Sequence, residues 1–123
     1  MARTYLDAFC QVRGIKKVKV WSPNTANAQT YAREAAELHG VECQVASFAR
    51  EAVRGVDIAA CCTSTNEPVF LTEWLEPGMH VTNLTSSELQ PNLLQVVDVA
   101  VRAGEATPGK EIPTDWFLQD IRD

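Results

Sequence analysis

A short apolar run, Val56-Asp57-Ile58-Ala59-Ala60-Cys61-Cys62, lies near the middle of this 123-residue chain. It does not alternate apolar with polar residues, a pattern typical of a strand that is covered on both faces in a parallel sheet. A turn of small hydroxyl residues follows, closed by Pro68. Ligands of open α/β sheets bind beyond the carboxyl ends of the strands, so Thr63, Ser64 and Thr65 are candidate binding residues. A buried strand followed by an ordinary polar loop is the alternative interpretation.

Helical and strand-like patterns alternate along the rest of the chain. Helices are expected at 3–12, 25–39, 47–53, 69–75 and 91–97, and strands at 16–21, 41–46, 56–62, 79–84 and 98–102. A loop at 103–113 and a helix that begins at Thr114 complete the pattern, with Trp116 and Phe117 on the apolar face of that helix. Alternation of strands and helices predicts a largely parallel sheet with right-handed crossovers.

Two local signals define the helix at 25–39. Ser22 or Asn24 can accept hydrogen bonds from the free amide groups at its start, and Gly40 suits its end. The helical spacing predicts that Leu38 faces inward, and the same argument places Phe48 inward at the start of the next helix.

Composition argues against several classes of function. The net charge is −5, and the only basic cluster is Lys16, Lys17 and Lys19, which we expect to be solvated groups at a sheet edge. A nucleic-acid partner is therefore not expected. The sequence also shows no signal peptide and no apolar run long enough to span a bilayer, so we expect neither a membrane partner nor export.

The four cysteines are Cys10, Cys43, Cys61 and Cys62, and no two of them form a CxxC pair. Cys61 and Cys62 would point to opposite faces of a strand, which argues against a shared metal site or a disulfide framework. Buried free thiols in a reducing cytoplasm are the simplest interpretation, and we expect no metal site.

Several motifs together resemble a known family. They are Val18-Lys19-Val20-Trp21-Ser22, Asn27-Ala28, Ala52-Val53-Arg54-Gly55-Val56-Asp57-Ile58, Thr63-Ser64 with Glu67-Pro68-Val69, and Glu73-Trp74-Leu75-Glu76-Pro77-Gly78-Met79-His80-Val81. In their order and spacing, from about Arg3 to about Leu89, they resemble the ornithine cyclodeaminase/μ-crystallin family. The resemblance implies a Rossmann domain that holds NAD(H) or NADP(H), beside a separate substrate and dimerisation domain. It also implies cyclising deamination of ornithine or reduction of imines and keto acids, although some members mainly bind ligands.

The resemblance also suggests site residues. Ser22 and Asn24 stand where the family contacts the adenosine ribose, although both also suit helix caps. Glu88 falls near the family's catalytic Asp and is the catalytic candidate, although a lone acidic residue in a polar loop is more often solvated, which is what we expect of it. The family's first strand and its Gly-rich phosphate turn would precede Arg3, and the sequence has no equivalent. NAD or NADP is thus the cofactor that the resemblance implies, but binding without that turn is in doubt.

We therefore expect an α/β fold of Rossmann-like, three-layer type, with a mostly parallel sheet that is truncated at its N-terminal strand. Residues 1–123 would form a single partial NAD(P)-binding domain. In the strand order 3-2-1-4-5 the absent strand is central, so its loss leaves two unpaired edges. The strands at 16–21 and 56–62 could then pair directly, a second copy could fill the gap, or another polypeptide could supply the strand. We expect a homodimer or a higher homo-oligomer.

Three functions remain open at this point. The first is a self-associating remnant of a cofactor domain that does not catalyse alone. The second is an NAD(P)-dependent amino-acid or imine oxidoreductase, or a cyclodeaminase, that another chain completes. The third is a small-molecule or protein-binding module that has reused the gap.

Overall fold

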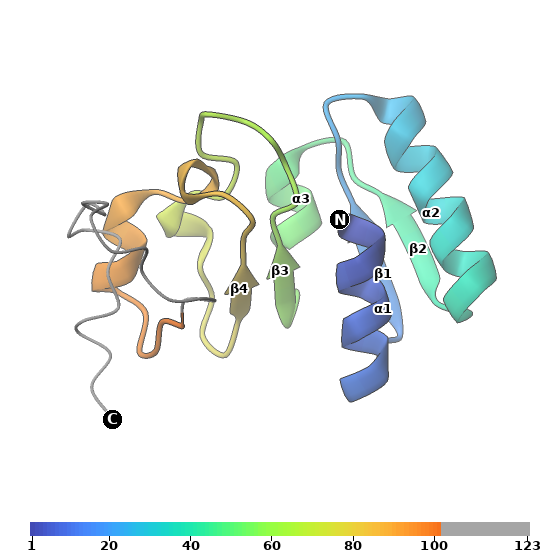
Figure 1. The fold of residues 1–123 in the computed structure, drawn as a ribbon, viewed down its shortest axis with the longest axis horizontal. Coiled ribbons are helices and arrows are strands. Elements are labelled where there is room, and N and C mark those ends of the chain that lie inside the picture. Colours follow the sequence, from blue (N-terminus) through green and yellow to red (C-terminus); the bar gives the residue numbers. More distant parts are fainter. Residues whose placement is uncertain (102–123) are drawn as a thin grey trace, which may run out of the picture.

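A computed structural model describes residues 1–101 as an α/β fold in three layers (Figure 1). Its strands are β1 (Lys17–Val20), β2 (Glu42–Val45), β3 (Ile58–Ala60) and β4 (His80–Thr82). Helices α1 (Ala2–Val12) and α2 (Thr25–His39) pack side by side on one face of the strands, and α3 (Ala49–Val53) lies on the other (Figure 1). The expected α/β class with parallel strands is confirmed.

Helix α2 begins and ends where the sequence predicts. The side chain of Asn24 accepts a hydrogen bond from the amide of Asn27 at 3.2 Å, and Gly40 closes the helix with a φ of 65°. The buried face is made of small residues, which lets the helix lie close to β1 and β2; they are Ala28, Ala32 and Ala35. Leu38 is 73% exposed, so its predicted inward position is wrong. It lies in the last turn, beside a groove between α1 and α2.

The four strands form two separate parallel pairs. Val18 lies opposite Cys43 in the pair β1–β2, and Ala59 lies opposite Val81 in the pair β3–β4. In Figure 1 the strands follow the order β4, β3, β1, β2 across the molecule, and α1 lies in front of β1. No strand of residues 1–101 pairs with both β1 and β3. Within residues 1–101, β1 pairs with β2 and β3 pairs with β4, so direct pairing of β1 with β3, one of the three expected outcomes, does not occur.

Strand β3 is less covered than its apolar sequence predicts. Ala59 is 3% exposed, but the next residue, Ala60, is exposed. Successive side chains of a strand point to opposite faces, so one face of β3 is buried and the other is only partly covered. The expectation of a strand covered on both faces is thus wrong at Ala60.

The main core lies beside the β3–β4 pair. Its buried members are Ala59, Cys61, Phe70, Leu89 and Leu93. Short 3-10 helices wrap around this core: η1 (Thr72–Trp74), η2 (Ser86–Glu88) and η3 (Pro91–Gln95). The ring of Trp74 packs edge-on against Phe70 with 6.0 Å between centroids. Each half of the split sheet therefore has its own packing, with the alanines of α2 on one side and this cluster on the other.

Three further expectations need correction. Residues 98–101 form no strand, and the part of the predicted strand at Arg102 lies outside the described residues, as do the loop at 103–113 and the helix with Trp116 and Phe117. Phe48 is 67% exposed, because it precedes α3 as the N-cap residue and does not lie on the packed face of the helix. Lys19 is not fully solvated. Its ammonium group donates a hydrogen bond to the carbonyl of Arg54 at 2.7 Å, at the end of α3.

Candidate functional site

The loops after β3 and β4 meet at the carboxyl ends of these strands, and we call residues 61–68 and 83–90 the rim. Their proximity is set by the parallel pairing, in which the amide of Cys61 donates to the carbonyl of Thr82 at 2.8 Å. The side chain of Ser87 reaches the carbonyl of Thr65 at 2.8 Å. The rim is therefore the place where the fold gathers most of the predicted site residues.

The side chain of Glu88 lies at the centre of the rim, with 0% of the residue exposed. One carboxylate oxygen accepts hydrogen bonds from the amide and the hydroxyl of Thr63, the latter at 2.8 Å. The other oxygen accepts from the amides of Leu84 and Thr85, at 2.6 and 3.0 Å. The expectation of a solvated Glu88 is wrong, because these donors from two loops enclose the carboxylate.

The surroundings of Glu88 favour its charged form. Burial raises the pKa of its carboxyl group, but the hydrogen bonds donated by Thr85, Thr63 and Leu84 outweigh burial. The pKa of Glu88 therefore lies below its ordinary value of 4.5. A general acid or base for neutral pH needs a pKa near 7, so this environment suits a fixed anion better than a proton carrier.

The three hydroxyl residues of the β3 loop are not equivalent. The hydroxyl of Thr63 donates to Glu88, and that of Thr65 accepts from the amide of Glu67 at 3.1 Å. Ser64 is exposed, and its hydroxyl makes no hydrogen bond within residues 1–101. Of the three predicted contacts to a cofactor, Ser64 thus offers the most accessible side chain.

Ser22 and Asn24 form a second group, after β1. The oxygen of Ser22 accepts a hydrogen bond from the amide of Asn24 at 3.2 Å, and Asn24 caps α2. Both side chains thus have structural roles that need no ligand, and no hydrogen bond in the described part of the chain joins them to the rim. Contact with a cofactor remains a prediction for all five residues, as does catalysis by Glu88.

Two thiols border the rim, and both resist ionisation. Burial and, to a smaller extent, the negative charge of Glu88 together raise the pKa of Cys61 to about 12. Burial and Glu88 likewise raise the pKa of Cys62. Because the thiolate is the nucleophilic form, neither cysteine is prepared for nucleophilic catalysis at neutral pH. Cysteine, histidine and acidic side chains also form no cluster of three or more that could hold a metal ion within residues 1–101.

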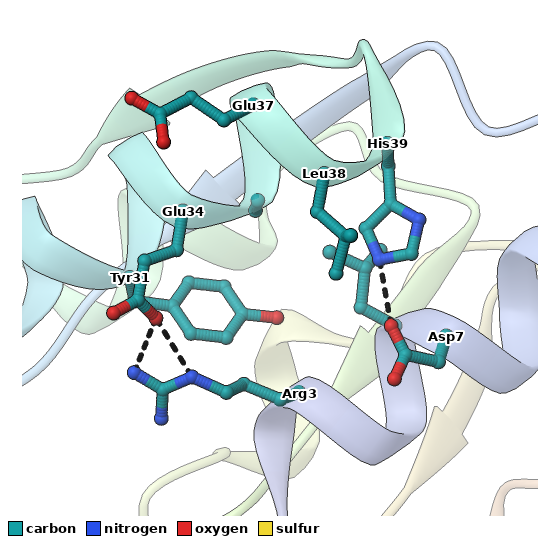
Figure 2. A pocket seen from close by; sticks show the side chains of 9 residues that line it. Arg3, Asp7, Tyr31, Glu34, Glu37, Leu38 and His39 are labelled. Carbon is teal, nitrogen blue, oxygen red and sulfur yellow. Dashed lines mark hydrogen bonds and ion pairs between the residues drawn. The ribbon is translucent and has the colours of Figure 1, made fainter.

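A separate groove of about 460 Å³ lies between α1 and α2 (Figure 2). The guanidinium group of Arg3 points to the carboxylate of Glu34, and the ring of His39 lies 2.7 Å from the carboxylate of Asp7. The hydroxyl of Tyr31 donates to the carbonyl of Ala2 at 3.2 Å, and burial raises the pKa of Tyr31 to about 12. The polar groups along the groove are thus hydrogen-bonded or ion-paired to one another, and these bonds hold α1 against α2.

The sequence contains one local signal for the position of Glu88. Thr85-Ser86-Ser87-Glu88 has the pattern of a capping box, in which an acidic side chain bonds the amide at the start of a helical turn. That pattern predicts the contact with Thr85. The contacts with Thr63 could not be found this way, because they join residues far apart in the sequence. The ion pairs between α1 and α2 have no sequence signal for the same reason.

Comparison with known proteins identifies relatives. The sequence model described as "Ornithine cyclodeaminase/mu-crystallin family" matches residues 1–111. The ketimine reductase mu-crystallin of Rattus norvegicus is 28% identical over 85% of this chain and 34% of its own length. An uncharacterized cyclodeaminase of Sinorhizobium fredii is 30% identical over 81% of this chain and 32% of its own length. The chain thus spans about a third of the length of these relatives.

A solved structure has the same fold. It is the Delta(1)-pyrroline-2-carboxylate reductase of Thermococcus litoralis in complex with NADH and L-proline, with a TM-score of 0.75 and 32% identity. The match covers 80% of this chain and 32% of the reductase chain. As for membranes, none of the helices within residues 1–101 combines the length and apolar character needed to cross one.

Proposed function

This chain belongs to the ornithine cyclodeaminase/mu-crystallin family, and on that premise we propose that its 123 residues form part of the dinucleotide-binding unit of an NAD(P)-dependent protein. We further infer that the 123-residue chain, taken by itself, does not catalyse and associates with a second copy. The observation that carries the proposed association is that β1 and β3 each have one unpaired edge, where the two strand pairs are neighbours.

The hydrogen bonds of each strand pair define which backbone groups are unpaired. In β1, the carbonyls of Lys16 and Val20 accept from β2, so the backbone groups of Lys17 and Lys19 face away from β2. In β3, Asp57 and Cys61 bond to β4, and the backbone groups of Ile58 and Ala60 face away from it. We call these two rows the open edges. They belong to neighbouring strands in Figure 1.

Open edges of this kind favour association. Unpaired backbone groups of a strand are a template for another strand, and leaving them unpaired away from water costs free energy. A second copy carries the same two open edges, so one symmetric contact could satisfy both copies at once. This argument favours a homodimer over a partner of different sequence.

The chemistry of the rim supports cofactor binding more than catalysis. The rim offers hydroxyl and amide groups at the carboxyl ends of parallel strands, where dinucleotides bind in such folds. Its acidic group, Glu88, already accepts hydrogen bonds from three residues, and its two thiols are protonated at neutral pH. The free cysteines fit a reducing compartment, and we propose the cytoplasm.

A second candidate function is an NAD(P)-dependent amino-acid or imine oxidoreductase, or a cyclodeaminase, that another chain completes. The observation in its favour is the exposed Ser64 in the rim, at the carboxyl ends of parallel strands where dinucleotides bind in such folds. The proposals differ in cofactor affinity. We expect the 123-residue chain to bind NADH and NADPH more weakly than about 100 μM, as measured by thermal shift. Tighter binding to the chain alone would favour the second candidate.

The association is tested by light scattering coupled to size exclusion. We expect a homodimer at micromolar concentration for the unchanged chain. Ala60→Pro removes an amide of an open edge and spares the bonds to β4, so it should weaken the dimer by roughly tenfold or more. Val45→Pro is the matched control, since Val45 lies in β2 and its amide faces away from β1. A monomeric unchanged chain, or equal weakening by both variants, contradicts the proposed contact.

A further inference from the structure

The carboxylate of Glu88 connects two loops that are far apart in the sequence. One oxygen accepts from Thr63 in the loop after β3, and the other accepts from Leu84 and Thr85 in the loop after β4. Each oxygen therefore serves one loop. A hydrogen bond broken at one oxygen would shift the carboxylate and weaken the bonds at the other.

A carboxylate is the side chain that suits this position. It only accepts hydrogen bonds, whereas an amide of the same size carries two donors that would face the amides of Thr63 or Leu84. Charge-assisted bonds of this kind are stronger than neutral ones. Glu88 forms no salt bridge within residues 1–101, so its negative charge is balanced by these donors. The buried charge is costly unless the donors stay in place.

The backbone of Glu88 also bonds to a third segment of the chain, at Val69 and Phe70. The carbonyl of Glu88 accepts from the amides of Val69 and Phe70 at 2.8 and 3.2 Å, next to the bridge between Phe70 and Leu89. The 3-10 helix η2 thus joins the rim to the core through its backbone and joins the two loops through one side chain. The exposed Ser64 lies directly after Thr63, so its position depends on this arrangement.

We propose that Glu88 is a positioning residue that couples the two loops of the rim, so that Ser64 and the neighbouring amides meet a dinucleotide as one rigid surface. This inference rests on the proposed function for the identity of the ligand. The coupling itself is a property of the chain without ligand, and it can be tested separately.

The coupling test uses substitutions in one loop and amide hydrogen exchange, followed by NMR, in the other. Thr63→Val removes the hydroxyl donor at nearly constant volume, and Thr63→Ser retains it. We expect Thr63→Val to raise exchange of the Leu84 and Thr85 amides by roughly tenfold, and Thr63→Ser to leave it close to that of the unchanged chain. An increase confined to residues 63–67, or an equal increase in both variants, overturns the proposal. A merely local structural role of Thr63 would not transmit the change across Glu88.

A second variant keeps the test decisive if Thr63→Val unfolds. Glu88→Gln should raise exchange in both loops but not in α2, whereas Glu76→Gln should leave both loops unchanged. Glu76 is the matched control, because its exposed carboxylate accepts one backbone bond, from Gly55 at 2.7 Å. Unchanged exchange in Glu88→Gln contradicts the coupling. Millimolar NADH added to the unchanged chain should shift the Ser64 amide signal, and its failure to do so would count against the proposed function and leave the coupling result intact.

Discussion

The ring of Phe9 in α1 lies edge-on against the ring of His80, the first residue of β4, with 6.4 Å between centroids and 79° between planes. His80 belongs to the pair β3–β4. Helix α1, which carries Phe9, also packs on α2, and α2 packs on the pair β1–β2. Helix α1 therefore bridges the two halves of a sheet whose own hydrogen bonds do not connect them.

This bridge predicts that Phe9→Ala destabilises the protein. Phe9 is half-buried, so we expect the free energy of unfolding to fall by roughly 1–3 kcal/mol, below the range for a fully buried Phe. Urea denaturation measures the change. Val12→Ala in the same helix should change stability by less than about 0.5 kcal/mol, since Val12 is 64% exposed. Equal effects of the two substitutions would show that α1 does not join the halves through Phe9.

The cap of α2 predicts a cost that does not depend on a cofactor. Asn24→Ala removes the acceptor for the amide of Asn27 and should lower the free energy of unfolding by about 1 kcal/mol in the absence of nucleotide. Asn27→Ala leaves the cap intact and introduces a better helix former, so it should be neutral or slightly stabilising. Thermal unfolding of both variants without ligand compares them. A neutral Asn24→Ala would indicate that Asn24 is retained for another role.

Glu88 predicts a dependence of stability on pH. Its pKa in the folded chain lies below the ordinary 4.5, so the folded state binds its proton less readily than the unfolded state does. The contribution of Glu88 to stability is therefore fully present above about pH 5 and is lost as the pH falls through the lowered pKa. Glu88→Gln should be less stable at neutral pH and should lose less stability on acidification. Parallel pH profiles for the two proteins, from urea denaturation, would contradict this assignment.

The raised pKa values of Cys61 and Cys62 predict slow alkylation. Burial holds the Cys61 thiol protonated, with a pKa of about 12, so iodoacetamide at pH 8 should modify it at least tenfold more slowly in the folded chain than in denaturant. Peptide mass spectrometry after timed quenching measures the rate at each cysteine. Rapid modification of Cys61 in the folded chain would mean that the strand end opens more readily than its packing indicates.

Much of the fold follows from short stretches of sequence. Asn24 and Gly40 define the limits of α2 because capping groups act on amides and carbonyls within one turn. Apolar runs separated by helices predict strands in a largely parallel sheet for a similarly local reason, but they do not indicate which strands pair. The same reasoning failed for Leu38 and Phe48, whose exposure depends on what packs against them and not on their helical spacing.

The candidate site could be predicted only in outline. The position of Thr63, Ser64 and Thr65 after an apolar strand indicates the carboxyl edge of a sheet, and the structure places them there. The difference between Thr63, which bonds Glu88, and the exposed Ser64 was not predictable, because Glu88 comes from another part of the chain.

Local patterns thus determined the order of helices and strands, the ends of α2 and the family resemblance, since each depends on neighbouring residues. The three-dimensional arrangement decided that β1 and β3 do not pair with each other, that α1 contacts β4 through Phe9 and so joins the two strand pairs, and that Glu88 is a buried anion. The physical reason is that edge pairing and desolvation depend on which distant segments come together, and amino-acid spacing along the chain does not encode those contacts directly.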